Sequence, residues 1–326
     1  MESNKNKYKI FCDSHPDIPL FSQYWWMDAA CIGKTWDVLL VEKSGEIIAT
    51  MPYLINKKLG FKYILQPQLT QTNGVYICYP IGQSENERLS FEKMVCTEII
   101  AQLEKTGISF FLQNFHHKFT NWLPFFWKGF SQTTRYTYLI ENIKNIEEVF
   151  KNFSPAKQRQ IRKAQKVGIT IDSHLSAEEF YDFHCKVLKQ KGENNLNSKE
   201  VELSIIKTAL QHGNGVILTA KDLAGNLHSA LFLVWDNNSA YYLIPATDVR
   251  FRSSGASTLI VYEAIRYVQE KCISFDFEGS MSENIENSYK QFGTKQIPYH
   301  QIKKSYNFLF KIFFTSSRTN GLSIFK

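Results

Sequence analysis

The sequence predicts an α/β (α+β) chain of two similar halves, each with a mixed, mostly antiparallel sheet flanked by helices. A β-hairpin pattern followed by a helix and a strand occurs twice, at about 36–112 and 216–278. The 326 residues are too many for one ordinary core, and 44% of them are hydrophobic, which is enough to bury a sizeable interior. The composition therefore argues against disorder and favours two domains.

The first half opens with a predicted hairpin. Apolar stretches at 36–41 and 47–54 flank the turn Lys43-Ser44-Gly45. Apolar residues at helical spacing follow, and then two more strand patterns. These further elements are a helix at 88–105 and strands at 108–112 and 134–140.

The second half repeats this order after three additional helices, which are expected at about 155–167, 177–191 and 198–211. A hairpin pattern at 216–220 and 227–235 surrounds the turn 223–226. The remaining elements are a strand at 240–244, a helix at 258–271, a strand at 273–278, a helix ending at Gly293 and a strand near Tyr299.

The boundary between the halves is expected between Glu141 and Ser154. This divides the chain into domains 1–145 and 146–304 and a basic aromatic tail, 305–326. No Gly- or Pro-rich linker marks the boundary, so we expect the halves to pack closely. For the tail we expect a helix docked on the first domain, with contact to an anionic membrane surface as the alternative.

The formal net charge of +7 is concentrated in a few segments. One lies between Lys157 and Lys166, and from Gln301 onward there are five cations and no Asp or Glu. This local basicity favours a phosphorylated cofactor, a nucleotide-linked substrate or an anionic surface, and it is not a DNA-binding composition. The six cysteines show no C-x-x-C pairing, and the sequence has no signal peptide or membrane-span pattern. These features predict a cytoplasmic location. Peripheral contact at the inner face of the membrane is left open.

A loop of small residues, Arg252-Ser253-Ser254-Gly255-Ala256-Ser257, opens the predicted helix at 258–271. Backbone N–H groups gather at such a helix entry, where the helix dipole favours phosphate. The alternative is an ordinary helix start capped by Ser254. Pro245 stands where the preceding strand should continue, and proline removes a ladder donor.

Three side chains after this helix could take part in proton transfer. Alternation predicts Asp276 and Glu278 on one face of their strand, where either could accept a proton from an attacking ammonium. Glu278 is preferred because it lies closer to the loop, and the alternative is a carboxylate bound by neighbouring N–H groups. Tyr289, on the next helix, carries a phenol with a pKa of about 10, which suits a general acid, or it is a half-buried helix tyrosine.

These residues resemble motifs of the GNAT (GCN5-related) N-acyltransferases. Arg252 and Gly255 match a Q/R-x-x-G-x-G/A loop, from which Ser257 departs, and Asn284, Tyr289 and Gly293 match N-x-x-x-x-Y-x-x-x-G. Together with the strings 154–169, 276–280 and 289–293, they resemble the FemAB-like branch, which has two tandem GNAT domains. The resemblance covers about Ser154 to Lys304 well and the first half in outline.

This resemblance implies an N-acyltransferase that uses acyl-CoA as a co-substrate and needs no metal. The donor would lie along Pro245 and the loop residues Arg252, Ser254, Gly255, Ala256 and Ser257. Tyr289 would protonate the leaving thiolate, with Glu278 or Asp276 as the base. The amine acceptor would be an amino sugar, a peptide or a cell-wall or polysaccharide precursor, held between the domains by Arg162, Lys163 and Lys290.

Two alternatives remain open. An aminoacyl-tRNA-dependent peptidoglycan-bridge transferase would bind tRNA, although this chain lacks the long coiled-coil arm that several such proteins carry. A non-catalytic binding protein that has kept the fold is the other.

Gly33-Lys34-Thr35 lacks the upstream glycine of a P-loop, and the adjacent His116 and His117 do not have the spacing of an i, i+4 metal pair.

Overall fold

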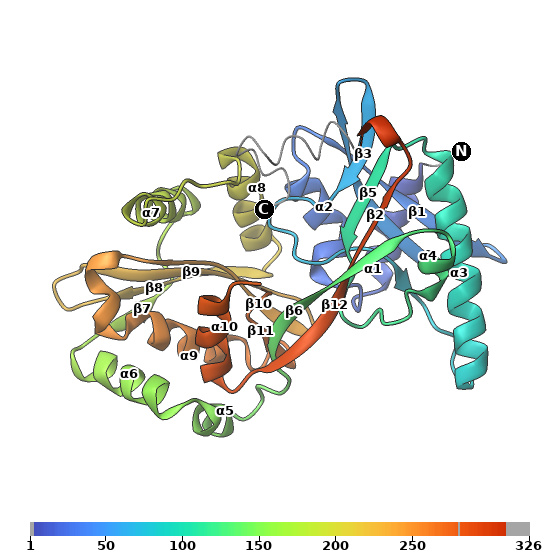
Figure 1. Cartoon of the computed structure of the whole chain (residues 1–326). Helices are drawn as coiled ribbons and strands as arrows, with labels where there is room; N and C mark the ends of the chain where they lie inside the picture. Colours follow the sequence, from blue (N-terminus) through green and yellow to red (C-terminus); the bar gives the residue numbers. More distant parts are fainter. Residues whose placement is uncertain (1–2, 280, 311–326) are drawn as a thin grey trace. The chain divides into compact units, whose positions relative to one another are not determined.

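The computed structural model describes residues 3–279 and 281–310, which form two compact units (Figure 1). Unit 1 contains residues 3–134 and 299–310, and unit 2 contains the described residues of 135–298. Both combine β-strands with α-helices, which confirms the predicted α/β class. The domain limits expected from the sequence stay a prediction, because the units are defined by contacts and each contains residues from both halves of the sequence.

Unit 1 is built on an antiparallel meander followed by a parallel strand. The meander strands are β1 (Thr35–Lys43), β2 (Glu46–Lys58) and β3 (Phe61–Leu65), and β4 (Tyr76–Ile77) pairs with β2. Helix α3 (Glu85–Lys105) leads to β5 (Phe110–Asn114), which is parallel to β3. The remaining helices are α1 (Asn4–Ser14), η1 (Leu20–Ser22), α2 (Tyr24–Ala30) and α4 (Leu123–Trp127).

Unit 2 repeats this topology. Its meander strands are β8 (Gly215–Lys221), β9 (Leu227–Trp235) and β10 (Ser239–Thr247), and β7 (Thr170–Asp172) extends the sheet beside β8. Helix α9 (Ala256–Val268) leads to β11 (Ser274–Asp276), which is parallel to β10. Tyr63 pairs with Phe110 in unit 1 as Ala240 pairs with Phe275 in unit 2, so the repeat read from the sequence is a repeat of topology.

The helices of unit 2 cover both faces of its sheet (Figure 1). Helices α7 and α8 lie on one face, and α6 packs against α9 on the other. The core on the α9 side includes Ile161, Ala164 and Phe275. The helices are α5 (Ile146–Asn152), α6 (Pro155–Lys166), α7 (Ala177–Gln190), α8 (Lys199–Gln211), α10 (Glu283–Tyr289) and the 3₁₀ turns η2 (Val249–Ser254) and η3 (Lys290–Phe292).

The last strand of each half of the sequence completes the sheet of the other half. In β6 (Ser131–Ile140), Ile140 pairs with Phe275 of β11. In β12 (Lys295–Ser305), Gln301 pairs with Asn114 of β5. Each unit therefore contains a strand supplied by the sequence half that builds the rest of the other unit.

The beginning of the predicted tail docks on unit 1, as expected. Phe310 is 1% exposed, and its ring lies 5.3 Å from the rings of both Tyr63 and Phe110. Residues 311–326, which include the rest of the tail and on which the alternative of membrane contact depends, lie outside the described residues. Within the part of the chain that the structure describes, no helix is long and apolar enough to cross a membrane.

Candidate functional site

The two parallel strands of unit 2 separate at the predicted site. β10 and β11 pair from Ser239↔Ser274 to Tyr241↔Asp276, and β11 then ends. β10 continues to Thr247, and its register with β9 shifts between Tyr241 and Ile244. Beyond Tyr241, backbone N–H groups of β10 therefore have no ladder partner on β11. Pro245 is an exposed residue of this continuation, so β10 extends to Thr247, past the strand predicted at 240–244.

Asp276 is a buried carboxyl at the end of β11. It is 2% exposed, and its Oδ1 accepts hydrogen bonds from Thr137 Oγ1 and from the backbone N of Glu278 at 2.7 Å. Burial raises the pKa of Asp276 to about 7, against the lowering effect of these two bonds. Asp276 therefore titrates near neutral pH, and its Oδ1 atom already accepts two hydrogen bonds.

Glu278 lies beyond the strand in a left-handed backbone conformation, with a φ of 59°. The alternation that predicted Asp276 and Glu278 on one strand face does not extend this far, because the strand predicted over 273–278 spans only Ser274–Asp276. Its Oε1 is buried without a hydrogen-bond partner among the described residues, although the residue as a whole is partly exposed. Burial, with the neighbouring Asp276, raises the pKa of Glu278 well above its ordinary range.

Tyr289 is the last residue of α10 and lies among aromatic rings. Its ring centroid is 5.0 Å from that of Phe277, 5.8 Å from Tyr138 and 6.3 Å from Tyr242. Burial raises the pKa of Tyr289 above its ordinary value, and Tyr242, Glu278 and Asp276 add to the effect. The phenol therefore stays protonated throughout the physiological range, as a general acid must before it donates.

The sequence analysis missed Thr137 and Tyr138 of β6. Thr137 donates to Asp276, and Tyr138 packs on Tyr289 while its hydroxyl accepts a hydrogen bond from Gln296 Nε2 at 2.8 Å. Both were visible as strand residues. Nothing in the local pattern indicated that this strand pairs with β11, more than 130 residues away in the chain.

The predicted donor loop forms the turn η2 and the entry of α9. Gly255 precedes the helix with a φ of 83°, and Ser254 Oγ accepts a hydrogen bond from Ala256 N at 3.2 Å. The N-cap position belongs to Gly255 and not to Ser254. A Cβ atom at Gly255 would lie 2.3 Å from the carbonyl oxygen of Gln160 on α6, so the packing of α6 against α9 requires glycine here, whatever the loop binds.

The predicted cationic contacts fall in three different places. Lys163 Nζ donates to the carbonyl oxygen of Ser253 at 2.6 Å, which places Lys163 at the loop that also carries the exposed Arg252. Arg162 turns toward α5, with its guanidinium 5.6 Å from the ring of Phe150. Lys290 pairs with Glu286 at 3.3 Å. The structure thus brings Lys163 to the predicted donor residues and does not group it with Arg162 or Lys290.

In unit 1 the counterpart of this site is filled by the chain itself. The carbonyl of the Gln66 side chain accepts from Asn114 N at 3.0 Å, and Asn114 Nδ2 donates to Gln71 O at 3.0 Å, which ties the ends of β3 and β5 together. Gln113 occupies the position of Glu278, three residues after the equivalent paired phenylalanine. Helix α3 begins with a Ser84–Glu87 capping box, and its nearest preceding glycine, Gly82, lies before the N-cap and not at it as Gly255 does in α9. These features favour a site in unit 2 alone.

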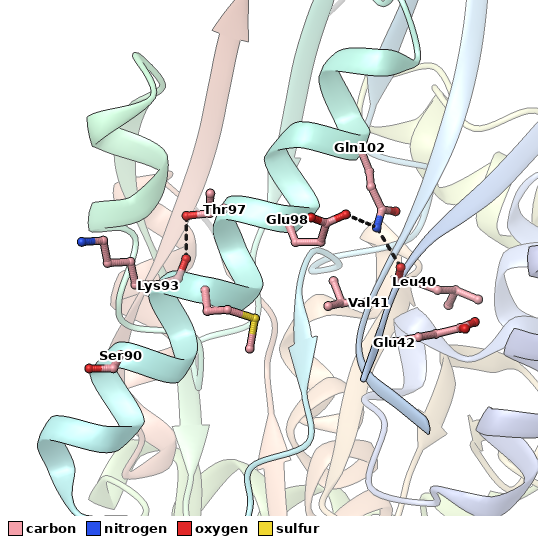
Figure 2. A pocket seen from close by; sticks show the side chains of 9 residues that line it. Leu40, Val41, Glu42, Ser90, Lys93, Thr97, Glu98 and Gln102 are labelled. Atoms are coloured by element: carbon pink, nitrogen blue, oxygen red, sulfur yellow. Dashed lines mark hydrogen bonds between the residues drawn. The ribbon is translucent and has the colours of Figure 1, made fainter. Parts of the chain in front are cut away.

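A surface groove of about 740 Å³ lies elsewhere in unit 1, between β1 and α3 (Figure 2). Gln102 Nε2 bridges its two walls by donating to Leu40 O at 2.9 Å and to Glu98 at 3.0 Å. None of the predicted site residues lines it. Among the residues that the structure describes, no group of three or more His, Cys, Asp or Glu side chains is arranged to hold a metal ion.

Residues 155–291 match the family model described as an acetyltransferase (GNAT) domain. The fold matches the crystal structure of FemX, with a TM-score of 0.67 and 16% identity over 92% of this chain and 96% of that one. Residues 155–291 are thus similar in sequence to a GNAT domain, and the chain as a whole has the fold of FemX.

Two further solved structures have a similar fold. L-PGS from Bacillus licheniformis is 11% identical, with 97% of each chain covered and a TM-score of 0.57. A conserved protein of unknown function from Bacteroides thetaiotaomicron is 10% identical, with 92% of this chain and 96% of that chain covered and a TM-score of 0.58. No curated protein sequence matches the chain. The matched GNAT domain contains α6, the donor loop, Glu278 and Tyr289, and it supports a transferase of the acyl or aminoacyl class.

Proposed function

We propose that this FemAB-like protein transfers an acyl group from acyl-CoA to a primary amine, and that the reaction takes place where β10 and β11 separate. One observation carries the proposal. A carboxyl oxygen of Glu278 is buried with no hydrogen-bond partner among the described residues, and the charge of Glu278 acts on the phenol of Tyr289, whose pKa it helps to raise. An orphaned buried acceptor is costly, and an incoming N–H group would satisfy it.

Direct attack of the amine accounts for these groups. The amine nitrogen forms a bond to the thioester carbonyl carbon, and the N–H groups of β10 beyond Tyr241 stabilise the oxyanion. The ionised form of Glu278 accepts the proton that the nitrogen loses, and the raised pKa of this carboxyl makes that form a stronger base. The C–S bond then breaks, and Tyr289 donates its proton to the departing sulfur, which leaves an amide and free CoA.

Asp276 acts in this scheme as a positioning residue. Its Oδ1 accepts hydrogen bonds from Thr137 and from the backbone of Glu278, so the carboxyl is anchored in the fold. The same bond fixes the turn that carries Glu278. We therefore assign the base to Glu278, the carboxyl that the sequence analysis preferred.

Lys163 and Arg252 would bind the phosphates of the donor, together with the N–H groups at the entry of α9, from Ala256 and Ser257. Lys163 supports this role because its ammonium already lies at the loop. Arg162 and Lys290, which point elsewhere, remain candidates for contact with the acceptor, an amino sugar, a peptide or a cell-wall precursor.

Radiolabelled acetyl-CoA and aminoacyl-tRNA, offered separately with a panel of amines to the full chain, would test the proposal. The expected result is transfer from acetyl-CoA that falls about 100-fold or more in Glu278→Gln and Tyr289→Phe. The matched controls are Glu283→Gln and Tyr267→Phe, two exposed positions on α10 and α9. Transfer only from aminoacyl-tRNA would replace the donor and keep the site. Binding of acetyl-CoA without transfer to any amine would favour a non-catalytic protein.

A further inference from the structure

Helix α4 presents three large apolar side chains to solvent on one face. Leu123, Phe126 and Trp127 are 48%, 56% and 57% exposed. Their spacing of i, i+3 and i+4 places them side by side on the helix surface. Single exposed apolar residues are common in proteins, but a contiguous group that includes Trp and Phe marks an interaction surface.

The exposed face stands on a rigid base. Phe125, the next residue along α4, is completely buried, and its ring lies 5.2 Å from both Phe115 and Phe130. Trp122 packs against Phe126 from the side, with ring centroids 5.5 Å apart. The exposure is therefore not a consequence of a loose helix end. The packing of Phe125 in the core of unit 1 keeps the rings of Phe126 and Trp127 on the outer face of α4.

The charges around this face are mainly positive. Lys93 of α3 places its Nζ 5.4 Å from the ring of Trp127, and Lys128 follows directly in the chain. Lys93 also lines the groove of Figure 2, where its ammonium group points away from Leu40 and Val41.

The nearby carboxylates are already engaged. Glu92 accepts hydrogen bonds from Tyr79 at 2.7 Å and from Asn121 at 2.7 Å, and it pairs with Arg88. Glu104 pairs with Lys304, which also donates to Lys128 O. The two lysines beside the apolar face are therefore not neutralised by these acids.

We infer that the α4 patch, defined as Leu123, Phe126 and Trp127 with Lys93 and Lys128, binds the surface of an anionic lipid bilayer. Trp and Phe settle at the interface between headgroups and acyl chains, and lysines attract anionic headgroups while their stems lie on apolar surface. Protein interfaces are instead depleted in lysine. Five residues of helix bury only these rings, so the contact is peripheral. This surface belongs to unit 1, whereas the residues of the proposed acyl-transfer site belong to unit 2.

Co-sedimentation of the full chain with phosphatidylcholine vesicles, with and without phosphatidylglycerol, would test this inference. Binding is expected to need phosphatidylglycerol, to weaken with added salt, and to fall about tenfold or more in the double variant Phe126→Ser, Trp127→Ser. Lys93→Gln with Lys128→Gln should weaken it as well. Leu223→Ser is the matched control, because Leu223 is 85% exposed but lies on the β8–β9 turn of unit 2.

Fluorescence separates insertion from simple charge attraction. Lipids with brominated acyl chains should quench the tryptophan fluorescence of the wild type more strongly than that of Trp127→Phe, because insertion of the α4 patch would bring Trp127 to the acyl region. The inference is overturned by the absence of binding to phosphatidylglycerol vesicles at low salt, or by binding that the Phe126 and Trp127 changes leave intact. Self-association that these changes abolish, without vesicle binding, would assign the patch to a second copy of the chain.

Discussion

Asp276 and Glu278 are joined by a hydrogen bond from the backbone N of Glu278 to the Oδ1 atom of Asp276, at 2.7 Å. This bond turns the chain away from β11 and holds Glu278 at a φ of 59°, a conformation that costs a residue with a Cβ atom about 1–2 kcal/mol. The buried carboxyl of one residue thereby determines where the second carboxyl points.

Replacing Asp276 should separate positioning from proton transfer. Asn keeps an oxygen that can accept from Glu278 N, whereas Ala leaves a buried N–H unsatisfied at a cost of about 1–3 kcal/mol. We expect kcat to fall about 10-fold to 100-fold in Asp276→Ala and much less in Asp276→Asn. Steady-state kinetics with the donor that supports transfer in the assay proposed above would measure this difference. Equal, large losses in both variants would instead make Asp276 the base.

Stability should depend on pH through Asp276. Its pKa is about 7 in the folded chain and about 4 when unfolded, so the folded state binds the extra proton between these values. The resulting contribution to stability is complete below about pH 4 and is lost as the pH rises to about 7. In urea unfolding, the free energy of unfolding of the wild type should fall more between about pH 5 and about pH 8 than that of Asp276→Asn. Parallel changes in both proteins would contradict the raised pKa.

Gly255 should tolerate no side chain. In Gly255→Ala, the strain of a positive φ adds to overlap with the carbonyl oxygen of Gln160, and we expect a loss of about 2–4 kcal/mol. Gly225→Ala is a matched control, because its φ of 81° is similar and nothing lies within 4 Å of the added atom. Gly225→Ala should lose only about 1 kcal/mol in urea unfolding. Similar losses at both positions would show that α6 yields to the new methyl group.

Lys163 and Arg162 are adjacent in sequence but should respond differently. Lys163→Gln removes the ammonium at Ser253 and should raise the KM for the acyl donor about 5-fold to 10-fold, with kcat nearly unchanged. Arg162→Gln removes a guanidinium that faces Phe150 and should leave the donor KM unaltered. Initial rates over a range of acetyl-CoA concentrations would show the split. A larger donor effect in Arg162→Gln would reverse the assignment.

The sequence predicted the repeated topology because hairpin turns and apolar periodicity are local signals. The strands predicted at 108–112 and 273–278 are equivalent, since Phe110 and Phe275 occupy matching positions in the two sheets. The helices α6, α7 and α8 were also expected close to their observed bounds.

The remaining features depend on contacts between distant residues. Glu278 has a positive φ that a glutamate rarely adopts, and its Oε1 atom is buried. Strand alternation assumes an extended backbone, so it predicted the wrong position for this side chain. Gly255 matched a cofactor motif, but Gln160, 95 residues earlier, gives it a packing role that no local pattern contains. Thr137 and Tyr138 were recognised as strand residues and not as site residues, because their partner strand lies in the other half of the sequence.

The reciprocal pairing of β6 with β11 and of β12 with β5 has a consequence for how this protein can be divided. A gene cut between Glu141 and Ser154 would encode two fragments, and each would lack a strand that its own sheet needs. Neither product should be an autonomous folding unit, and each would expose an unpaired sheet edge prone to aggregation. Co-expressed, the fragments should complement each other. Because of this strand exchange, the two halves of the chain should fold only together. A mutation that changes the stability of one half should therefore change the stability of the other.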